Sequence, residues 1–386
     1  MKALVVGGNS GLGLSLVCNL LKQGYDKVYI IGKDDLNYYD IDESFRNEFF
    51  KKTIVYKVNF TLGDYSILNE INDINALFIT LGFGRVALFE NLIDSEINNL
   101  IKVNLSSVVR IIKHYYNSIN SDNDFYTSVI SSICGRIVSP FFSVYSASKA
   151  GLRFFVESVN CELEANGKSN RILDVSPGSI SGTGFNGGKT KLDLIDELSR
   201  EIIYRTFNKE CLYIPKYDEI YKNVIEKYQN NPHDFALESY NYKKESNRKN
   251  DKPQITVGYL SGTFDLFHIG HLNLLRRARA ECDYLIVSVH SSGAWKGKET
   301  FIPYEERKAI VESIKYVDKV VDDYLEDIDA WNDFHYDKLF VGSDYKGTER
   351  FERYEIFLKD KAEIVYFPYT IGTSSTQLRN RLKEKK

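Results

Sequence analysis

The sequence predicts an α/β fold made of two doubly wound parallel sheets, one in each half of the chain. Two glycine-punctuated strand–turn–helix starts support this prediction, the first after the apolar run 3–6 and the second after 255–260. Behind each start, short apolar runs alternate with helix-length segments, which is typical of parallel strands joined by crossover helices. The two glycine loops differ in spacing, so the halves are unlike domains rather than repeats.

Further strands are expected at the other short apolar runs. They are 28–31, 77–80, 128–131 and 172–175 in the first half, and 284–289, 339–341 and 364–367 in the second. Between the halves, residues 229–253 are rich in Asn, Lys, Glu and Ser and have no sustained apolar period, which is typical of a linker. We therefore expect a domain over 1–230, a linker over 231–253 and a second domain over 254–386.

Length and composition exclude several classes of protein. The chain has 386 residues, 43% apolar and 27% charged, with a net charge of −3, which indicates neither disorder nor binding to nucleic acid or a membrane surface. No apolar run approaches the ~18 residues that span a bilayer, and the chain starts as a strand rather than a signal peptide. The five cysteines are scattered without a CxxC pair, which favours a reducing cytoplasm over a disulfide framework or a structural zinc site.

The first glycine loop indicates a phosphate site. Gly7, Gly11 and Gly13 lie between the first expected strand and its helix. Glycines at such a turn let the backbone approach a pyrophosphate at the helix N-terminus, although a purely structural turn stays possible.

A phenol and an ammonium, those of Tyr145 and Lys149, lie four residues apart on one expected helix face. A carbonyl that accepts hydride must be protonated, and a phenol donates that proton more readily when a nearby cation lowers its pKa from about 10. The pair is therefore suited to protonating such a carbonyl, although Tyr145 could be a packing aromatic among 27 tyrosines.

Over roughly residues 1–228 these motifs resemble the short-chain dehydrogenase/reductase superfamily, which implies a Rossmann-like domain. Residues 6–13 match its TGxxxGxG pattern with Val6 in place of threonine, and Thr80-Leu-Gly stands where the family has Asn-Ala-Gly. The implied catalytic set is Asn104, Ser132, Tyr145 and Lys149. The implied cofactor set is Gly7, Asn9, Ser10, Gly11, Leu12, Gly13, Lys33, Asn59, Gly82, Pro177 and Gly178.

NADPH is the expected cofactor. Family members that prefer NAD usually have an acidic residue at the end of the second strand, where this chain has Gly32 and Lys33. Lys33 could meet a ribose 2′-phosphate, whereas no carboxylate stands there to hold a 2′-hydroxyl. Asp34 and Asp35 follow directly, so NADH stays the alternative.

The second glycine loop, Gly262-Thr-Phe-Asp-Leu-Phe-His-Ile-Gly-His, contains two of the six histidines. At a helix start, His268 and His271 share one face beside the positive end of the helix dipole. Imidazoles and backbone N–H groups there can stabilise the charge that builds as a phosphodiester forms and pyrophosphate leaves. The pair could instead bind a metal or be structural, but no third ligand stands at a recognised spacing.

From about Thr256 onward the chain resembles the cytidylyltransferases that make CDP-glycerol, CDP-choline and CDP-ethanolamine. The resemblance implies attack of an acceptor phosphate on CTP with Mg²⁺, and adds Lys296 to the catalytic histidines. Two departures from the family are Tyr369 and Lys315, each in place of an arginine. The implied CTP-binding set is Gly262, Thr263, Phe264, Asp265, His268, His271, Lys298, Arg307, Asp344, Thr370, Ser374 and Ser375.

Together the halves suggest a bifunctional enzyme that forms at least a homodimer. We expect the first domain to reduce a keto-phosphate, with a pentulose 5-phosphate favoured, and the second to couple the alditol phosphate to CTP. The product would be a CDP-alditol for a capsule, teichoic-acid or O-antigen polymer. Two alternatives stay open: the first domain could be a regulatory nucleotide-binding module, or it could reduce a CDP-linked product after the transfer.

Overall fold

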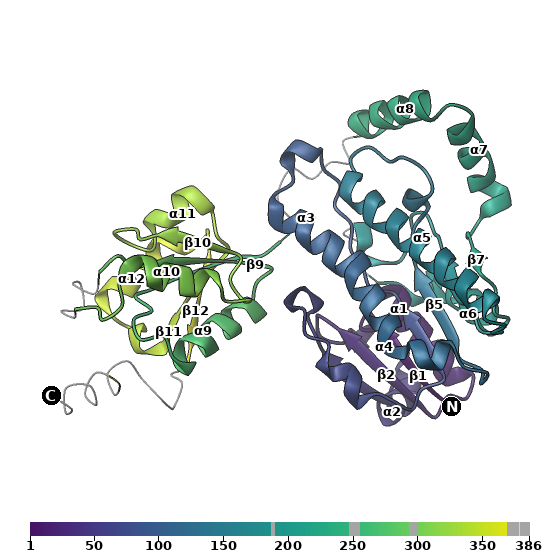
Figure 1. The fold of residues 1–386 in the computed structure, drawn as a ribbon, viewed down its shortest axis with the longest axis horizontal. Coiled ribbons are helices and arrows are strands. Elements are labelled where there is room, and N and C mark those ends of the chain that lie inside the picture. The colour runs from purple at the N-terminus through teal and green to yellow at the C-terminus, as the bar shows by residue number, and fades with distance from the viewer. Residues whose placement is uncertain (187–189, 247–254, 293–298, 369–377, 379–386) are drawn as a thin grey trace. The chain divides into compact units, whose positions relative to one another are not determined.

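The computed structural model describes residues 1–186, 190–246, 255–292, 299–368 and Leu378. The chain divides into two compact units, Met1–Pro253 and Gln254–Lys386 (Figure 1). Each unit is built on one parallel sheet with helices on its faces, which confirms the predicted pair of α/β domains.

The first unit contains a seven-stranded sheet in the order β3-β2-β1-β4-β5-β6-β7, with every strand pair parallel. Its order reverses between β1 and β4, so loops diverge there and leave a crevice at the carboxyl ends of these strands. The strands are β1 Lys2–Val6, β2 Lys27–Gly32, β3 Thr53–Lys57, β4 Ala76–Ile79, β5 Tyr126–Ile130, β6 Ile172–Val175 and β7 Leu212–Tyr213.

Helices cover both faces of this sheet. Along β1, Leu4 and Val6 join one apolar core, whereas Ala3 and Val5 join the other. This two-sided burial explains why the strand reads as a continuous apolar run rather than an alternating one. The helices are α1 Gly11–Lys22, α2 Glu43–Lys52, α3 Asp94–Ile101, α4 Val108–Ile119, α5 Ser143–Ala165, α6 Asp196–Phe207, α7 Lys222–Asn230 and α8 Pro232–Glu245.

The expected linker over 231–253 is wrong in its first part, because α8 occupies 232–245. Asn231 caps this helix by accepting a hydrogen bond from the Asp234 N–H at 3.2 Å, and Pro232 suits the first turn. Tyr240 and Lys243 pack against the loop before α5. The helix α8 is held by a few aromatic and cationic contacts and has no apolar stripe along one face. Because such a stripe is the sequence signal for a packed helix, α8 was not predicted.

The second unit contains a five-stranded parallel sheet in the order β10-β9-β8-β11-β12, with separate cores on its two faces. Its order reverses between β8 and β11, which leaves a second crevice at their carboxyl ends. No helix of the described residues is long and apolar enough to cross a membrane. The elements are β8 Val257–Gly262, α9 Ile269–Ala280, β9 Tyr284–Val289, α10 Tyr304–Glu312, β10 Lys319–Asp322, α11 Asp329–Phe334, β11 Lys338–Gly342, α12 Glu349–Leu358 and β12 Glu363–Phe367.

Candidate active sites

The glycine loop of the first unit permits backbone contacts that no side chain would allow. A Cβ on Gly13 would lie 2.1 Å from the Gly7 carbonyl oxygen, and one on Gly7, whose φ is +85°, would lie 2.5 Å from Thr80 Oγ1. The helix α1 begins at Gly11, so its unpaired N–H groups lie at the carboxyl edge of β1. The loop therefore has the shape and polarity of a phosphate cradle.

Thr80 fastens this loop to the neighbouring strand. It follows β4, and its hydroxyl lies 3.1 Å from both the Val6 and the Gly7 carbonyl oxygens, between which it shares its proton. The family has asparagine where this chain has Thr80. The threonine hydroxyl therefore still fastens the glycine loop to the end of β4.

The expected cofactor residues beyond the loop fall into two groups. Asn9 is buried and donates a hydrogen bond to the Asp34 carbonyl at 3.2 Å, and Lys33 is exposed directly after β2. Asp35 pairs with Lys57 at 3.0 Å. Asn59 differs, because its side-chain oxygen accepts hydrogen bonds within its own turn, from the N–H and hydroxyl groups of Thr61.

The four expected catalytic side chains of this unit are all buried at the carboxyl edge of the sheet. The Lys149 ammonium lies 5.9 Å from the centroid of the Tyr145 ring, and Ser132 hydrogen-bonds the Tyr145 phenol. At Gly82, an added Cβ would lie 3.0 Å from Lys149 Nζ and 3.1 Å from Asn104 Oδ1. The structure therefore brings the four residues together, with Lys149 and Asn104 beside Gly82.

Asn104 lies on a π-helical turn, Lys102–Ser107, inserted between α3 and α4. Its amide donates to the Phe83 carbonyl at 2.9 Å and its oxygen accepts from the Phe83 N–H at 3.0 Å. Such turns often occur at functional sites, where they redirect a side chain. The sequence predicted a helix here but gave no sign of the π turn.

Burial sets the proton affinities of the Tyr145–Lys149 pair. It lowers the pKa of Lys149 to about 8 and raises the pKa of Tyr145 well above its ordinary value. Desolvation therefore raises the pKa of the phenol, where the sequence predicted a lowering by Lys149. The Lys149 ammonium donates at 2.8 Å to the Ile130 carbonyl.

Aromatic rings around Tyr145 were not anticipated from the sequence. Phe142 and Phe185 lie with their ring centroids 5.6 and 5.5 Å from that of Tyr145. Lys243 of α8 holds the preceding loop by donating to Ser139 Oγ at 2.6 Å and to the Pro140 carbonyl at 2.9 Å. It also lies 5.3 Å from the Phe142 ring centroid. A residue almost a hundred positions from Tyr145 thus supports its surroundings.

The loop after β6 closes the same edge. The Pro177 carbonyl accepts a hydrogen bond from the Ile133 N–H at 2.9 Å, which joins this loop to the turn that begins at Ser132. A Cβ on Gly178 would lie 1.6 Å from the Tyr221 hydroxyl oxygen. Tyr221 therefore packs directly on the expected cofactor residue Gly178, a contact that the sequence did not indicate.

In the second unit, Asp265 anchors the glycine loop rather than projecting from it. Its buried carboxylate accepts hydrogen bonds from the backbone N–H groups of Phe301 at 3.1 Å and Ile302 at 3.0 Å. The residues on either side, Phe264 and Leu266, have φ of +51° and +48°. Non-glycine residues in this region are strained, and such strain clusters at ligand sites.

Arg307 is fully buried and donates to four backbone carbonyls, two of them in the loop after β9. The acceptors are Ile302 at 2.9 Å, His290 at 2.7 Å, Ser291 at 2.9 Å and Thr263. These hydrogen bonds make Arg307 a support for the loops around the site, and its contact with CTP stays a prediction. Its guanidinium joins three loops, and burial lowers its pKa.

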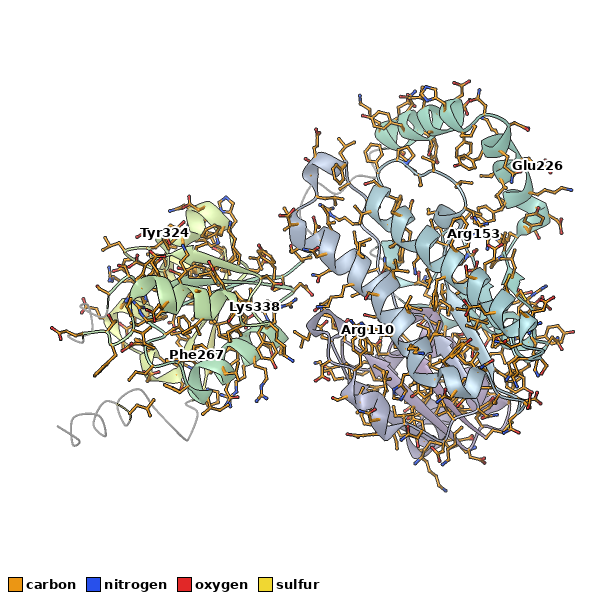
Figure 2. All side chains as sticks on the ribbon, in the orientation of Figure 1. Arg110, Arg153, Glu226, Phe267, Tyr324 and Lys338 are labelled. Carbon is orange, nitrogen blue, oxygen red and sulfur yellow. The ribbon has the colours of Figure 1, made fainter. Side chains whose placement is uncertain are left out.

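The two expected histidines meet at the N-terminus of α9. Their ring centroids are 4.0 Å apart, and Phe267 (Figure 2) lies 5.5 Å from the His271 ring. His268 caps the helix, with Nδ1 accepting from the Gly270 N–H at 3.0 Å, so its ring proton resides on Nε2. Burial lowers the pKa of His268, which favours the neutral form.

The other expected residues of this unit are placed only in part. Asp344 lies in the turn after β11, where a Cβ on Gly342 would be 2.3 Å from its Oδ1. Among the described residues, no group of three or more His, Cys, Asp or Glu side chains could hold a metal ion. Lys296, Lys298, Thr370, Ser374, Ser375 and the departure at Tyr369 lie outside the described residues.

Both units match known protein families. Residues 1–192 match the short chain dehydrogenase model and residues 259–381 match the cytidylyltransferase-like model. Glycerol-3-phosphate cytidylyltransferases of Staphylococcus aureus and Bacillus subtilis are 40% and 38% identical to the second unit. The alignments cover 31% of this chain and 90% and 92% of those proteins.

Solved structures similar to this chain include a short-chain dehydrogenase from Streptomyces avermitilis. It is 17% identical with a TM-score of 0.48, and the match covers 64% of this chain and 98% of that one.

Proposed function

Because this chain belongs to the cytidylyltransferase-like family and also carries a short-chain dehydrogenase domain, it is a bifunctional reductase and cytidylyltransferase, and we propose that both activities serve one metabolite. The first unit reduces a ketose phosphate, preferably a pentulose 5-phosphate, to an alditol phosphate. The second couples that product to CTP and releases pyrophosphate. The observation that carries this proposal is the buried Tyr145–Lys149 pair in the same chain as the His268–His271 pair.

The residues of the first unit fit a nicotinamide dinucleotide, because the loop 7–13 leaves no room for any Cβ at Gly7 or Gly13. Exposed Lys33 at the end of β2 favours NADPH through its 2′-phosphate. When bound, NADPH supplies the hydride for the carbonyl carbon.

Proton transfer is the task of this chain's own residues in the reduction. Ser132 donates a hydrogen bond to the carbonyl oxygen, and Tyr145 gives its phenolic proton to the oxyanion that develops there. Lys149, with Asn104 beside it at Gly82, then returns a proton to the phenolate. The carbonyl thereby gains one hydride and one proton and becomes a secondary alcohol.

In the second unit, a phosphate oxygen of the alditol phosphate attacks the α-phosphorus of CTP. The bond from that phosphorus to the pyrophosphate oxygen breaks as the new phosphodiester forms. His268 and His271 at the α9 N-terminus stabilise the added negative charge through N–H donors and the helix dipole. Asp265 and Arg307 keep the surrounding loops in position.

The CDP-alditol fits the activated precursor of a capsule, teichoic-acid or O-antigen polymer. Mass spectrometry tests the complete sequence of reactions. The protein is incubated with CTP, Mg²⁺, NADPH and either ribulose 5-phosphate or xylulose 5-phosphate. We expect a CDP-pentitol that requires both CTP and NADPH, and no pentitol product with either ketose would refute the assignment.

Two variants separate the reactions in that assay. Tyr145→Phe should form alditol phosphate at least roughly 100-fold more slowly but should still convert supplied ribitol 5-phosphate. His271→Ala should accumulate alditol phosphate and form the CDP product at least roughly 100-fold more slowly.

The aromatic rings of Phe142 and Phe185 beside Tyr145 favour a second order of events, in which a larger CDP-linked ketose is reduced after transfer. NADPH oxidation measured with and without CTP distinguishes the two orders. Oxidation that strictly requires CTP would establish the second, whereas oxidation with ketose phosphate alone supports the first.

A further inference from the structure

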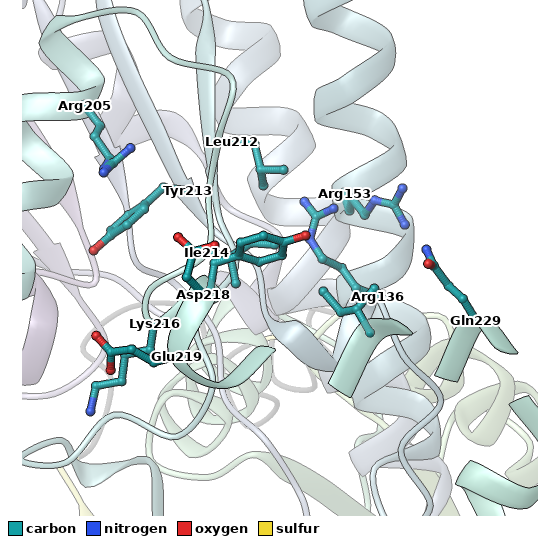
Figure 3. A pocket seen from close by; sticks show the side chains of 12 residues that line it. Arg136, Arg153, Arg205, Leu212, Tyr213, Ile214, Lys216, Asp218, Glu219 and Gln229 are labelled. Atoms are coloured by element: carbon teal, nitrogen blue, oxygen red, sulfur yellow. The ribbon is translucent and has the colours of Figure 1, made fainter. Parts of the chain in front are cut away.

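The first unit contains a cavity of about 620 Å³ whose lining includes none of the four catalytic residues. Arg136 follows the turn after β5, Arg153 lies on α5, and the remaining wall comes from residues 205–229 (Figure 3). That wall lies beyond residues 1–192, which match the dehydrogenase model. The cavity is therefore formed largely by the part of the unit that this family model does not describe.

Two guanidinium groups share one wall of this cavity. Figure 3 shows Arg136 and Arg153 on the same side of it, with Gln229 next to them. Burial lowers the pKa of Arg136 and the charge of Asp174 raises it, while the positive charge of Arg153 lowers it, as expected for two neighbouring cations. Like charges at one wall favour an anion between them.

Arg153 retains hydrogen-bonding capacity toward this wall. Its Nε–H is buried and has no hydrogen-bond partner among the described residues, and its Nη2 lies 3.6 Å from the exposed carboxylate of Glu157. A buried donor without an acceptor is unfavourable, and a small turn of the Arg153 side chain toward a ligand oxygen would satisfy it. Arg205 differs, because Glu201 and Glu210 each hold it at 2.7 Å.

Other lining groups are suited to hydroxyl groups. Asp218 and Glu219 provide carboxylate acceptors, Gln229 provides an amide, and Tyr213 and Tyr217 provide aromatic rings. Carboxylates and amides hydrogen-bond hydroxyls, and aromatic rings pack against C–H groups. This set matches a molecule that carries one phosphate and several hydroxyl groups.

We propose that this cavity is a second binding site for a phosphorylated polyol, with the phosphate held by Arg136 and Arg153 and the hydroxyl groups by Asp218 and Gln229. The site follows from its lining and does not depend on which reactions the catalytic residues perform.

A buried polar network connects this site to the catalytic residues. Arg136 pairs with Asp174 and donates to Ser176 Oγ at 2.9 Å, and Ser131, next to the catalytic Ser132, donates to the other oxygen of Asp174. The charge of Asp174 also raises the pKa of Lys149 against the effect of burial. A phosphate at Arg136 would compete with Asp174, so the cavity and the surroundings of Lys149 share one network.

Arginine labelling tests the site directly and requires no turnover. The full chain is treated with phenylglyoxal, and modified peptides are quantified by mass spectrometry with and without ribitol 5-phosphate. We expect ribitol 5-phosphate to slow the labelling of Arg153 at least five-fold and to leave that of Arg200, an exposed arginine on α6, unchanged. Equal rates at Arg153 would overturn the proposal.

Two further arms identify the ligand chemistry. Ribitol should not protect Arg153, and inorganic phosphate should protect it less than ribitol 5-phosphate at the same concentration. If inorganic phosphate protected Arg153 as well as ribitol 5-phosphate does, the cavity would be a simple anion site. That result would refute the proposal.

Calorimetric titration of ribitol 5-phosphate supplies an independent measurement. Arg153→Gln should remove one binding event, whereas Arg200→Gln should keep every event of the unchanged chain. Retention of all events in Arg153→Gln would contradict the site, while failure of the proposed catalytic function would leave this result unaffected.

Discussion

The two units use a buried cation in opposite ways. Lys149 of the first unit is buried beside Tyr145 and donates at 2.8 Å to the Ile130 carbonyl. Arg307 of the second unit is equally buried, but four backbone carbonyls accept its hydrogen bonds. A guanidinium keeps its proton and, with so many fixed acceptors, positions loops, whereas a lysine with few acceptors and a pKa lowered to about 8 can move a proton. Residue type and hydrogen-bond partners together indicate the role.

The most direct way to break this comparison is to remove the proton donor of the first unit. Tyr145→Phe deletes the phenolic hydroxyl and keeps the ring, so reductase turnover should fall by roughly 10²- to 10⁴-fold. Cytidylyl transfer to supplied ribitol 5-phosphate should not change. Tyr204→Phe, at an exposed position on α6, is the matched control. Near-normal NADPH oxidation by Tyr145→Phe would remove Tyr145 from the mechanism.

The corresponding change in the second unit is His271→Ala. Loss of a charge-stabilising donor should lower cytidylyl transfer by roughly 10²- to 10³-fold, measured as pyrophosphate release. The reductase rate of the same sample serves as an internal standard. His335→Asn, at an exposed histidine with φ of +43°, controls for loss of an imidazole. Full pyrophosphate release by His271→Ala would make the pair structural.

Arg307→Lys sharpens the distinction between a positioning and a reactive cation. Lysine keeps the charge but cannot reach four carbonyls, and the acceptors left unsatisfied should cost about 3 kcal/mol of the free energy of unfolding of the second unit. Urea unfolding followed by hydrogen exchange of each unit measures this, with exposed Arg353→Lys as control. An unchanged stability together with weaker CTP binding would restore Arg307 as a ligand-contacting residue.

Sequence reasoning succeeded where a local pattern determines the structure. Both glycine loops and the inner strands of each sheet were predicted, because close backbone approach and two-sided burial restrict the residues that fit. The strands β3, β7 and β10, which lie at sheet edges, were not predicted. Sequence reasoning did not identify Arg307 as a loop clamp, because a motif gives a position and not its hydrogen-bond partners. It also missed the α8 contacts and the π turn at Asn104, since these depend on residues distant in the chain.

The pH dependence of the two activities offers a smaller test. A pKa of Lys149 lowered from 10.5 to about 8 means that the ammonium loses its proton as the pH rises through about 8. Reductase kcat should therefore decline above this pH, whereas cytidylyl transfer by the same chain should show no inflection from this group. Stopped-flow NADPH oxidation between roughly pH 6 and pH 10 measures it, because this range extends about two units to either side of the shifted pKa. A reductase rate that stays level to pH 10 would show that deprotonation of Lys149 does not limit the reaction.

The smallest expected effect concerns Lys243, which tests whether α8 belongs to the catalytic machinery. Lys243→Met keeps the aliphatic stem but removes the hydrogen bonds to Ser139 and Pro140, so the ring of Phe142 loses its support beside Tyr145. Reductase kcat should fall roughly five-fold, equivalent to about 1 kcal/mol, while KM for NADPH stays constant.

Lys243→Arg should restore most of that rate, because a guanidinium can donate to the same two oxygens, and Lys244→Met at the exposed neighbouring position should have no effect. If Lys243→Arg lost as much reductase kcat as Lys243→Met, or if Lys243→Met lost cytidylyl transfer to the same extent, the effect would be general destabilisation. A selective and rescuable loss would instead show that a helix expected to be a linker positions the residues around the reducing phenol.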